Sequence, residues 1–235
     1  MTDLTEELRA ALMKLDTPTV CNALEIVAPK RRGYGYTVQP LVCTRPEQPP
    51  MVGVARTAAI RAQHPSDLQG EDARAMQDGY YAYVDEGGPK PAIMVIQDLD
   101  GDQRGYGSWW GEVNSNIHKG FGCLGLVTDG SVRDIPDIAE DFQMLADRVG
   151  PSHAYVHPVA YGQPVTVAGM RVVSGDLIHA DQHGAVVIPW DAAGDVPAAA
   201  EDIARREAVI IGASQEPGFD MARLRKAWGD AAEIH

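Results

Sequence analysis

The residue types in this chain that best suit chemistry are Arg133 and Asp134, side by side, with Gly111 and Glu112 earlier in the sequence. Arg133 offers a planar fork of donors that can pair with a carboxylate or a developing enolate oxygen. Asp134 can hold a hard divalent cation, with waters in the other coordination positions. Gly111 lets a ligand approach the backbone closely. Together these residues predict an oxyanion-binding Lewis-acid site.

The elements around these residues form a predicted βαβ unit. Residues 92–96 and 124–128 are short apolar, β-branched runs, which are typical of buried strands. Between them, Ser108 is the predicted N-cap of a helix over residues 110–119, and Gly120 fits the position after its end. A crossover helix of that length indicates that the two strands are parallel.

Parallel strands of such a unit end at the edge of the sheet where the helix begins. We therefore expect several polar groups to converge there: Asp98, Asp100, the amides of residues 111–114, Arg133 and Asp134. The unpaired N–H groups and the dipole of a helix N-terminus suit a carboxylate or a phosphate. This edge is the predicted active site.

The same residues also have a purely structural interpretation. Arg133 and Asp134 could form an ion pair after an Asp-Gly turn, and Glu112 could be an ordinary acid at a helix start. Asp137 fits either indirect support of a bound metal or helix capping.

Two other motifs are interpreted as structural. Residues 120–125 match G-x-G-x-x-G, but these glycines close a helix and open a strand, the reverse of a dinucleotide fingerprint. His179, Asp181 and His183 alternate and could share a transition metal. We favour a hairpin there, because Asp-Gln-His-Gly is turn chemistry between two apolar runs.

The spacing of residues 111–112 and 133–137 resembles the signature of the 4-hydroxy-4-methyl-2-oxoglutarate aldolases. Those enzymes belong to the family named after regulator of ribonuclease activity A. Three further segments resemble the family: a helix entry at 15–24, a core strand at 52–56 and a late hairpin at 175–189. The similarity spans about residues 10 to 212.

The resemblance implies a divalent-metal-dependent (class II) pyruvate aldolase, often with oxaloacetate decarboxylase activity, that works through a pyruvate enolate. The substrate carboxylate would bind largely to backbone amides, those of Gly111, Glu112, Val113 and Asn114. Arg133 would bind the keto or enolate oxygen, Asp134 would bind magnesium or manganese, and Glu112 would position metal-bound water for proton transfer.

The resemblance also implies an α/β fold: a layered α-β-β-α sandwich of the swivelling β/β/α type, with a mixed sheet and a βαβ active-site unit. It implies a homotrimer or homohexamer with sites near subunit interfaces. Four features depart from the family pattern: Asn114 and Asn116 at positions expected to be apolar or small, Asn22 at a commonly acidic one, the bulky Trp109-Trp110, and the segment of residues 63–91.

Because of these departures, the substrate stays open among 2-oxo acids that contain a pyruvyl unit. Oxaloacetate and a sugar-acid-derived substrate are alternatives at the same site. A non-catalytic protein-binding regulator is the alternative from another class.

Composition fits one compact domain, residues 1–235, with a helical tail from about residue 197. The formal net charge of −13, without a Lys/Arg stripe, disfavours nucleic-acid binding. Three scattered cysteines favour a reducing cytoplasm. No signal peptide or apolar run of membrane-spanning length is expected.

Periodicity predicts an α/β front half and a β-rich back half. Predicted helices cover residues 5–14, a segment after Thr17 capped by Asp16 or Thr17, 197–212 and 218–229. Predicted strands lie near 52–62, 91–98, 124–128, 154–156, 164–168, 170–173, 177–180 and 184–188. Aromatic residues such as Tyr80 and Trp110 are more often core than pocket residues.

Overall fold

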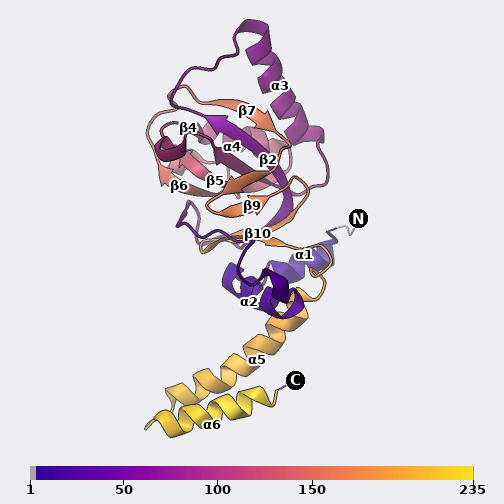
Figure 1. Ribbon diagram of the computed structural model, residues 1–235, viewed down its shortest axis with the longest axis vertical. Coiled ribbons are helices and arrows are strands. Elements are labelled where there is room, and N and C mark those ends of the chain that lie inside the picture. The colour runs from indigo at the N-terminus through magenta and orange to yellow at the C-terminus, as the bar shows by residue number, and fades with distance from the viewer. Residues whose placement is uncertain (1–3, 235) are drawn as a thin grey trace.

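The computed structural model describes residues 4–234, which form a mixed α/β fold (Figure 1). The α-helices are α1 (Glu6–Leu12), α2 (Thr17–Val27), α3 (Gly70–Glu86), α4 (Glu112–Gly120), α5 (Val196–Gln215) and α6 (Met221–Ala232). The strands of the first half are β1 (Val42–Cys43), β2 (Met51–Arg61), β3 (Ala92–Asp98), β4 (Ser108–Trp110) and β5 (Cys123–Val132). Those of the second half are β6 (Gln143–Val149), β7 (His157–Tyr161), β8 (Val165–Val167), β9 (Met170–Val172), β10 (Leu177–Asp181) and β11 (Gly184–Ile188).

The main sheet has the strand order β1-β6-β5-β3-β2-β10-β11, with β4 added on β5 and β7 on β2. Its centre is parallel, because β2, β3, β5 and β6 all run in the same direction. The register pairs Ile93 with Gly125 and Ile96 with Thr128, so β3 and β5 end at one edge, as predicted. The flanks are antiparallel, and β8 and β9 form a separate two-stranded sheet.

Apolar side chains form three cores. The first core lies on the face of the sheet that α3 and α4 cover, and it contains Tyr80, Trp110 and Leu126. The second core combines Ile93 of β3 with Val187 of β11, strands that lie apart in the sheet order, so the sheet curls around it. The third core lies beyond β10 and β11, against α1, α2 and α5.

Local sequence explains where the N-terminal helices begin. Thr5 accepts a hydrogen bond from the Leu8 amide at the start of α1, over 3.2 Å. Asp16 caps α2 by accepting from the Thr19 amide at 2.8 Å, and Pro18 occupies the first turn, where no donor is needed. The predicted capping at residues 16–17 is therefore confirmed for Asp16.

Several segments differ from the sequence-based prediction. Residues 154–156 are not a strand, because β7 starts only at His157 after Ala154 adopts a left-handed φ of 46°. Helix α3 and strands β1, β4 and β6 were not predicted. The polar residues of α3 mask a narrow buried face that includes Tyr80 and Val84, and in β6 the charged Asp147 and Arg148 break the apolar pattern.

The C-terminal helices α5 and α6 pack on each other and project from the body of the molecule (Figure 1). Both helices agree with the predicted helical tail. That residues 1–235 form one single domain stays a prediction. Within residues 4–234, no helix combines the length and the apolar character that crossing a bilayer requires.

Candidate active site at the start of helix α4

The corner between β4 and α4 differs from the prediction at its first residue. Ser108 is not a helix cap: it lies in β4, pairs with Ser131 of β5, and its hydroxyl is 2.6 Å from the Ser131 hydroxyl. The helix starts at Glu112 and its N-cap is Gly111. Pairing of Ser108–Trp110 with β5 outweighs the local capping preference, because it also buries Trp110 in the first core.

Helix α4 starts without a side-chain cap, because Gly111 has no side chain to supply one. The Glu112 amide points to Asp134 Oδ2 at 3.3 Å. Among the described residues, the amides of Val113 and Asn114 have no acceptor. Two donors at the positive end of the helix dipole thus remain available for an anion. The side chains of Glu112 and Val113 are exposed beside them.

The turn that follows β5 brings Arg133 and Asp134 against this helix start. Asp134 adopts a left-handed backbone with φ 53°, which is uncommon for a residue other than glycine. Its Oδ2 lies 3.4 Å from Arg133 Nε, and Arg133 donates its backbone N–H to the Trp110 carbonyl at 2.8 Å. A Cβ at Gly111 would collide with Asp134 Oδ2 and lie 3.0 Å from Arg133 Cγ. A side chain at this position would have to displace the Asp134 carboxylate.

A cleft of about 380 Å³ opens beside the two residues. Its lining is Arg133, Asp134, Ile135, Pro136, Val149, Gly150 and Pro151. The last three residues are the end of β6 and the two residues after it, and they were not predicted because β6 was not predicted. A parallel strand beside β5 must end at the same edge, so recognising β6 would have identified them.

A buried polar layer supports α4 from behind. The Asn114 side chain turns inward: its Nδ2 donates to the Trp109 carbonyl at 2.6 Å, and its Oδ1 accepts from Tyr81 at 2.8 Å. His118 donates from Nδ1 to the Asn114 carbonyl at 2.7 Å and accepts from the Tyr80 hydroxyl at Nε2, also at 2.7 Å. Burial lowers the pKa of His118 to about 4, so the ring is neutral at pH 7.

Asp98 and Asp100 belong to a different network. Asp98 accepts from the Gly105 amide at 2.8 Å, and its own amide donates to Asp129 at 2.8 Å. Asp100 accepts from the amides of Ala62 and Gln63. These carboxylates hold the loop after β3, and no hydrogen bond or ion pair in the described structure joins them to Arg133 or Asp134. The expected convergence is therefore correct for residues 111–114, 133 and 134 alone.

Burial acts on the two innermost carboxylates of that loop network. It raises the pKa of Asp129 to about 6, against the lowering effects of the Asp98 amide and of Arg104. The pKa of Asp98 is raised by burial as well. Both groups are thus poorly solvated anions that hold backbone in place.

Asp137 closes the short 3-10 turn of residues Ile135–Asp137, where its amide donates to the Asp134 carbonyl at 2.9 Å. Its side chain is exposed and caps no helix in the part of the chain that the structure describes. The helix-capping interpretation of Asp137 is therefore wrong, and support of a ligand at Asp134 stays a prediction.

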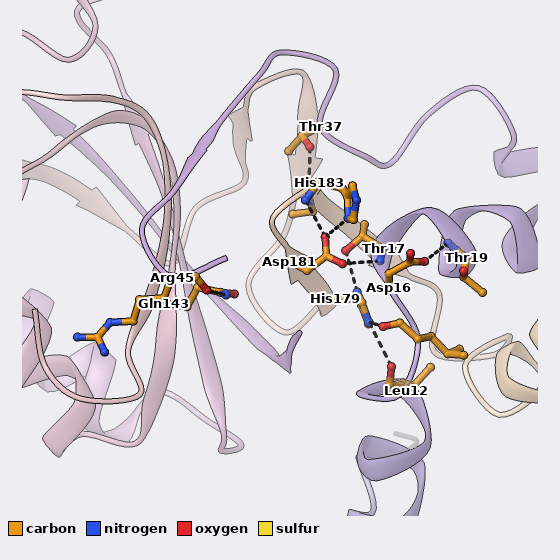
Figure 2. Close-up of polar contacts among 12 residues, drawn as sticks. Leu12, Asp16, Thr17, Thr19, Thr37, Arg45, Gln143, His179, Asp181 and His183 are labelled. Atoms are coloured by element: carbon orange, nitrogen blue, oxygen red, sulfur yellow. Dashed lines mark hydrogen bonds and ion pairs between the residues drawn. The ribbon is translucent and has the colours of Figure 1, made fainter. Parts of the chain in front are cut away.

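The late hairpin agrees with its prediction. β10 and β11 pair antiparallel around residues 182–183. Asp181 accepts from the amides of Thr17 and His183 at 2.9 and 2.8 Å, while His179 Nδ1 is 3.0 Å from the Thr17 hydroxyl (Figure 2). His179 Nε2 donates to the carbonyls of Leu12 and Leu15. These side chains tie the N-terminal helices to the sheet, so all of them have structural partners.

Metal-ligating side chains do not cluster in this protein: across residues 4–234, no group of three or more His, Cys, Asp or Glu side chains is arranged to hold an ion. A cation at Asp134 would need other ligands.

Comparison with known proteins gives a family and a fold. The family model described as "RraA-like: Aldolase/RraA" matches residues 17–187. A curated relative, the uncharacterized protein MJ0644 of Methanocaldococcus jannaschii, is 30% identical over 121 residues, which are 50% of this chain and 57% of that protein. The chain thus aligns with little more than half the length of that relative.

Solved structures agree in fold. An uncharacterized protein from Pseudomonas syringae has a TM-score of 0.72 at 22% identity, covering 97% of this chain and 96% of its own. Streptomyces coelicolor RraAS2, described as an unusual member of the RNase ES inhibitor RraA protein family, has a TM-score of 0.67 at 24% identity, with 88% and 96% covered. These likenesses support the mixed α/β fold with its curled sheet, while the layered swivelling sandwich stays a prediction. Because the family model covers most of the sequence and includes the β3–β5 unit, this chain belongs to the RraA-like Aldolase/RraA family.

Proposed function

We propose that the protein is a divalent-metal-dependent lyase of the class II pyruvate aldolase type, which cleaves or decarboxylates a 2-oxo acid with a pyruvyl unit. One observation carries the proposal. The turn at Arg133 and Asp134, with its left-handed backbone, lies against the uncapped start of α4, at a glycine whose missing side chain leaves room for the Asp134 carboxylate. A strained turn beside unpaired donors is typical of a binding site.

The substrate carboxylate binds at the helix start in this proposal. The free amides of Val113 and Asn114 donate to it, and the dipole of α4 favours its negative charge. Asn114 contributes only its backbone, since its side chain is engaged by Trp109 and Tyr81. Gly111 keeps the approach to these amides open.

Arg133 is the group that faces the developing charge. When the bond between C3 and C4 of the substrate breaks, its electron pair enters the pyruvyl unit and the 2-oxo oxygen becomes an enolate oxygen. The guanidinium of Arg133 stabilises this oxygen more than the ground-state carbonyl. Nε of Arg133 is buried and has no hydrogen-bond acceptor among the described residues. The 2-oxo oxygen of the substrate would accept this hydrogen bond once the guanidinium moves slightly away from Asp134. Glu112, exposed at the helix start, would position the water that delivers the proton taken up by C3.

Asp134 is the residue that would hold a metal. Its carboxylate is 39% exposed, and neither of the contacts to Oδ2, at 3.3 and 3.4 Å, is close. Magnesium keeps several waters and often takes only one or two protein carboxylates, so a single aspartate beside a substrate cleft fits magnesium or manganese. When bound there, the cation would supply Lewis-acid polarisation of the 2-oxo group. Asp137, two residues beyond the cleft-lining Ile135, is assigned to support of its water ligands.

The identity of the leaving half distinguishes two versions of this chemistry. Decarboxylation of oxaloacetate releases carbon dioxide and pyruvate, whereas cleavage of a sugar-acid-derived substrate releases an aldehyde and pyruvate. Product analysis over a panel of 2-oxo acids distinguishes the versions, because both depend on Arg133 and Asp134.

A regulator that acts by binding another protein is the second candidate function. It is favoured by the likeness to RraAS2 and to a Thermus thermophilis protein described as the RNA-processing inhibitor RraA, with a TM-score of 0.51 at 18% identity, covering 71% of this chain and 90% of its own. Tight binding of an endoribonuclease without metal-dependent turnover would favour this function.

The remaining features of the proposal concern the setting of the enzyme. We assign it to the cytoplasm, where its three free cysteines stay reduced, and to a homotrimer or homohexamer. Its negative net charge argues against a nucleic-acid partner, whereas local donors can bind a small anionic substrate despite that charge.

The test is pyruvate release from oxaloacetate and from 4-hydroxy-4-methyl-2-oxoglutarate, with magnesium or manganese, with a chelator, and with Asp134→Ala. We expect turnover that chelation abolishes and that Asp134→Ala lowers by about 100-fold or more. Asp202→Ala, which removes a carboxylate from the exposed surface of α5, is the matched control. If no pyruvate were released with magnesium and none with manganese, the proposal would be contradicted.

A further inference from the structure

A second cavity, of about 200 Å³, lies far from the cleft at Asp134 in the fold, between α2 and the loop that follows it. Its lining residues are Cys21, Leu24, Glu25, Arg31, Arg32, Tyr34, Tyr36 and Val186. It shares no residue with the cleft at Asp134. The proposed lyase chemistry makes no use of it.

The walls of this cavity are held in place by backbone hydrogen bonds. Gly35 accepts from the Val187 amide at 2.8 Å, and Thr37 donates to the Ala185 carbonyl at 2.9 Å, so the loop continues the sheet beyond β11. Tyr36 forms a β-bridge with Val186. On the other side, Leu24 is buried in the third core. The cavity is thus largely pre-formed, as ligand sites usually are.

Arg31 is the unusual residue of the lining. Within residues 4–234, its guanidinium has no carboxylate within 4.0 Å and no hydrogen-bond acceptor, and its Nε is shielded from solvent. It lies over the Tyr34 ring, with Cζ 5.4 Å from the ring centroid, and covers Gly35, where a Cβ would collide with it. The neighbouring Arg32 pairs with Glu25 at 3.1 Å. The chain has a net charge of −13 and many carboxylates, yet none of those described pairs with the Arg31 guanidinium. A partly buried cation without a partner indicates that an external anion binds there.

We propose that this cavity binds a small monocarboxylate with an apolar or aromatic body. The carboxylate pairs with Arg31, and rotation about the last bonds of that side chain turns Nε toward the ligand. Leu24, Tyr36 and Val186 contact the apolar body. One unpaired cation matches one negative charge, and the Glu25 carboxylate in the lining disfavours dianions such as succinate or phosphate.

The site goes beyond the proposed lyase function and does not depend on it. The two cleft linings come from different elements, α2 and β11 in one case and the ends of β5 and β6 in the other. Methyl resonances therefore distinguish them: Leu24 and Val186 report on this cavity, and Ile135 and Val149 report on the cleft at Asp134.

The experiment is a titration of the full chain, labelled with ¹³C at methyl groups, with benzoate and 3-methylbutanoate, and with succinate and phosphate at matched ionic strength. We expect saturable shifts of the Leu24 and Val186 methyl resonances with the two monocarboxylates and weaker shifts with the dianions. No shift at these methyls, shifts confined to Ile135 and Val149, or a preference for dianions would each overturn the proposal.

Two variants test the role of Arg31. Arg31→Met keeps the apolar stem and should weaken benzoate binding by roughly tenfold or more, since a charged hydrogen-bond partner is lost. Lys30→Met removes the same charge from an exposed neighbour outside the cavity and should leave the affinity within about twofold. Equal affinities of the two variants would contradict the assignment. Should Arg31→Met fail to fold, the wild-type titration decides alone.

Discussion

Two aspartates of this protein lie at the ends of strands of the same curled sheet, β5 and β10, yet their surroundings are opposite. Asp181, at the end of β10, is 7% exposed and accepts from two amides and from His183 Nδ1 at 3.1 Å (Figure 2). Asp134, after β5, is 39% exposed and has one amide at 3.3 Å and one guanidinium nitrogen at 3.4 Å. Their backbones differ as well, because Asp134 adopts a left-handed conformation whereas Asp181 lies in regular strand.

The difference teaches how to tell a structural carboxylate from one kept for a ligand. A carboxylate that stabilises a fold is buried and its lone pairs are satisfied by the chain itself. A carboxylate that binds a ligand keeps acceptor capacity unused, and the backbone around it stores strain. Residue type alone does not distinguish them, since both were candidate ligands in the sequence.

The largest expected effect comes from Asp134→Gly. Glycine adopts the left-handed conformation freely, so stability should stay unchanged or rise by up to about 1 kcal/mol, although the carboxylate is lost. Pyruvate release should fall by about 100-fold or more. Steady-state kinetics and urea unfolding measure the two quantities separately. A marked loss of stability would show that Asp134 is structural after all.

Asp181→Ala should give the opposite result. It leaves the buried amide of Thr17 and that of His183 without an acceptor, at a cost of about 3 kcal/mol in unfolding free energy. Activity per folded molecule should stay close to that of the wild type. Asp202→Ala, at an exposed ion pair of α5, is the control and should change stability by less than about 0.5 kcal/mol. If both variants unfold at the same urea concentration, the hairpin network carries no stability.

Lowering the pH tests both regions, the site at α4 and the late hairpin, because each contains a buried histidine whose protonation destabilises the fold. Burial lowers the pKa of His118 behind the site to about 4, and it also lowers the pKa of His179 in the hairpin. A group with a depressed pKa contributes its full stability above its unfolded pKa and loses it as the pH falls toward the folded pKa. For His118, the loss runs from about pH 6.5 to 4 and should reach about 2 kcal/mol at pH 5.

Urea unfolding at pH 7 and pH 5 of the wild type and of His118→Asn measures this term. The variant should lose less stability between the two pH values than the wild type. Asp129 acts in the other direction, because its raised pKa of about 6 favours the folded state as the pH falls, so the two slopes are compared and not the absolute values. If the unfolding free energies of the wild type and the variant fell equally between pH 7 and pH 5, the folded protein would hold His118 in a protonated or solvent-accessible state.

Much of the frame could be predicted from the sequence, because the signals were local. The apolar runs of β3 and β5 and the turn chemistry at Asp181–Gly184 depend on neighbouring residues, and both were confirmed. Gly111, Arg133 and Asp134 were identified by spacing, and the structure brings these three together.

The rest depended on distant partners. Ser108 is a good helix cap in isolation, yet its pairing with Ser131 across the sheet makes it a strand residue. Asp98 lies at the end of a strand much as Asp134 does, but amides of the following loop take up its carboxylate. The left-handed turn at Asp134, which distinguishes it most clearly from Asp181, has no signal in the residue type.

The smallest expected effect tests whether the layer behind α4 belongs to the site or only to the core. Tyr81→Phe removes the donor to Asn114 Oδ1 and should cost about 1 kcal/mol of stability. Because Asn114 lies in the first turn of α4, the same change should lower turnover a few-fold. Tyr83→Phe is the matched control: its hydroxyl accepts from the Thr57 amide at 3.1 Å and contacts the Ser174 hydroxyl at 2.6 Å, away from α4. It should cost similar stability without affecting turnover. Equal activity of the two variants would place the Tyr81–Asn114 contact with the Asp181 network, as part of the scaffold.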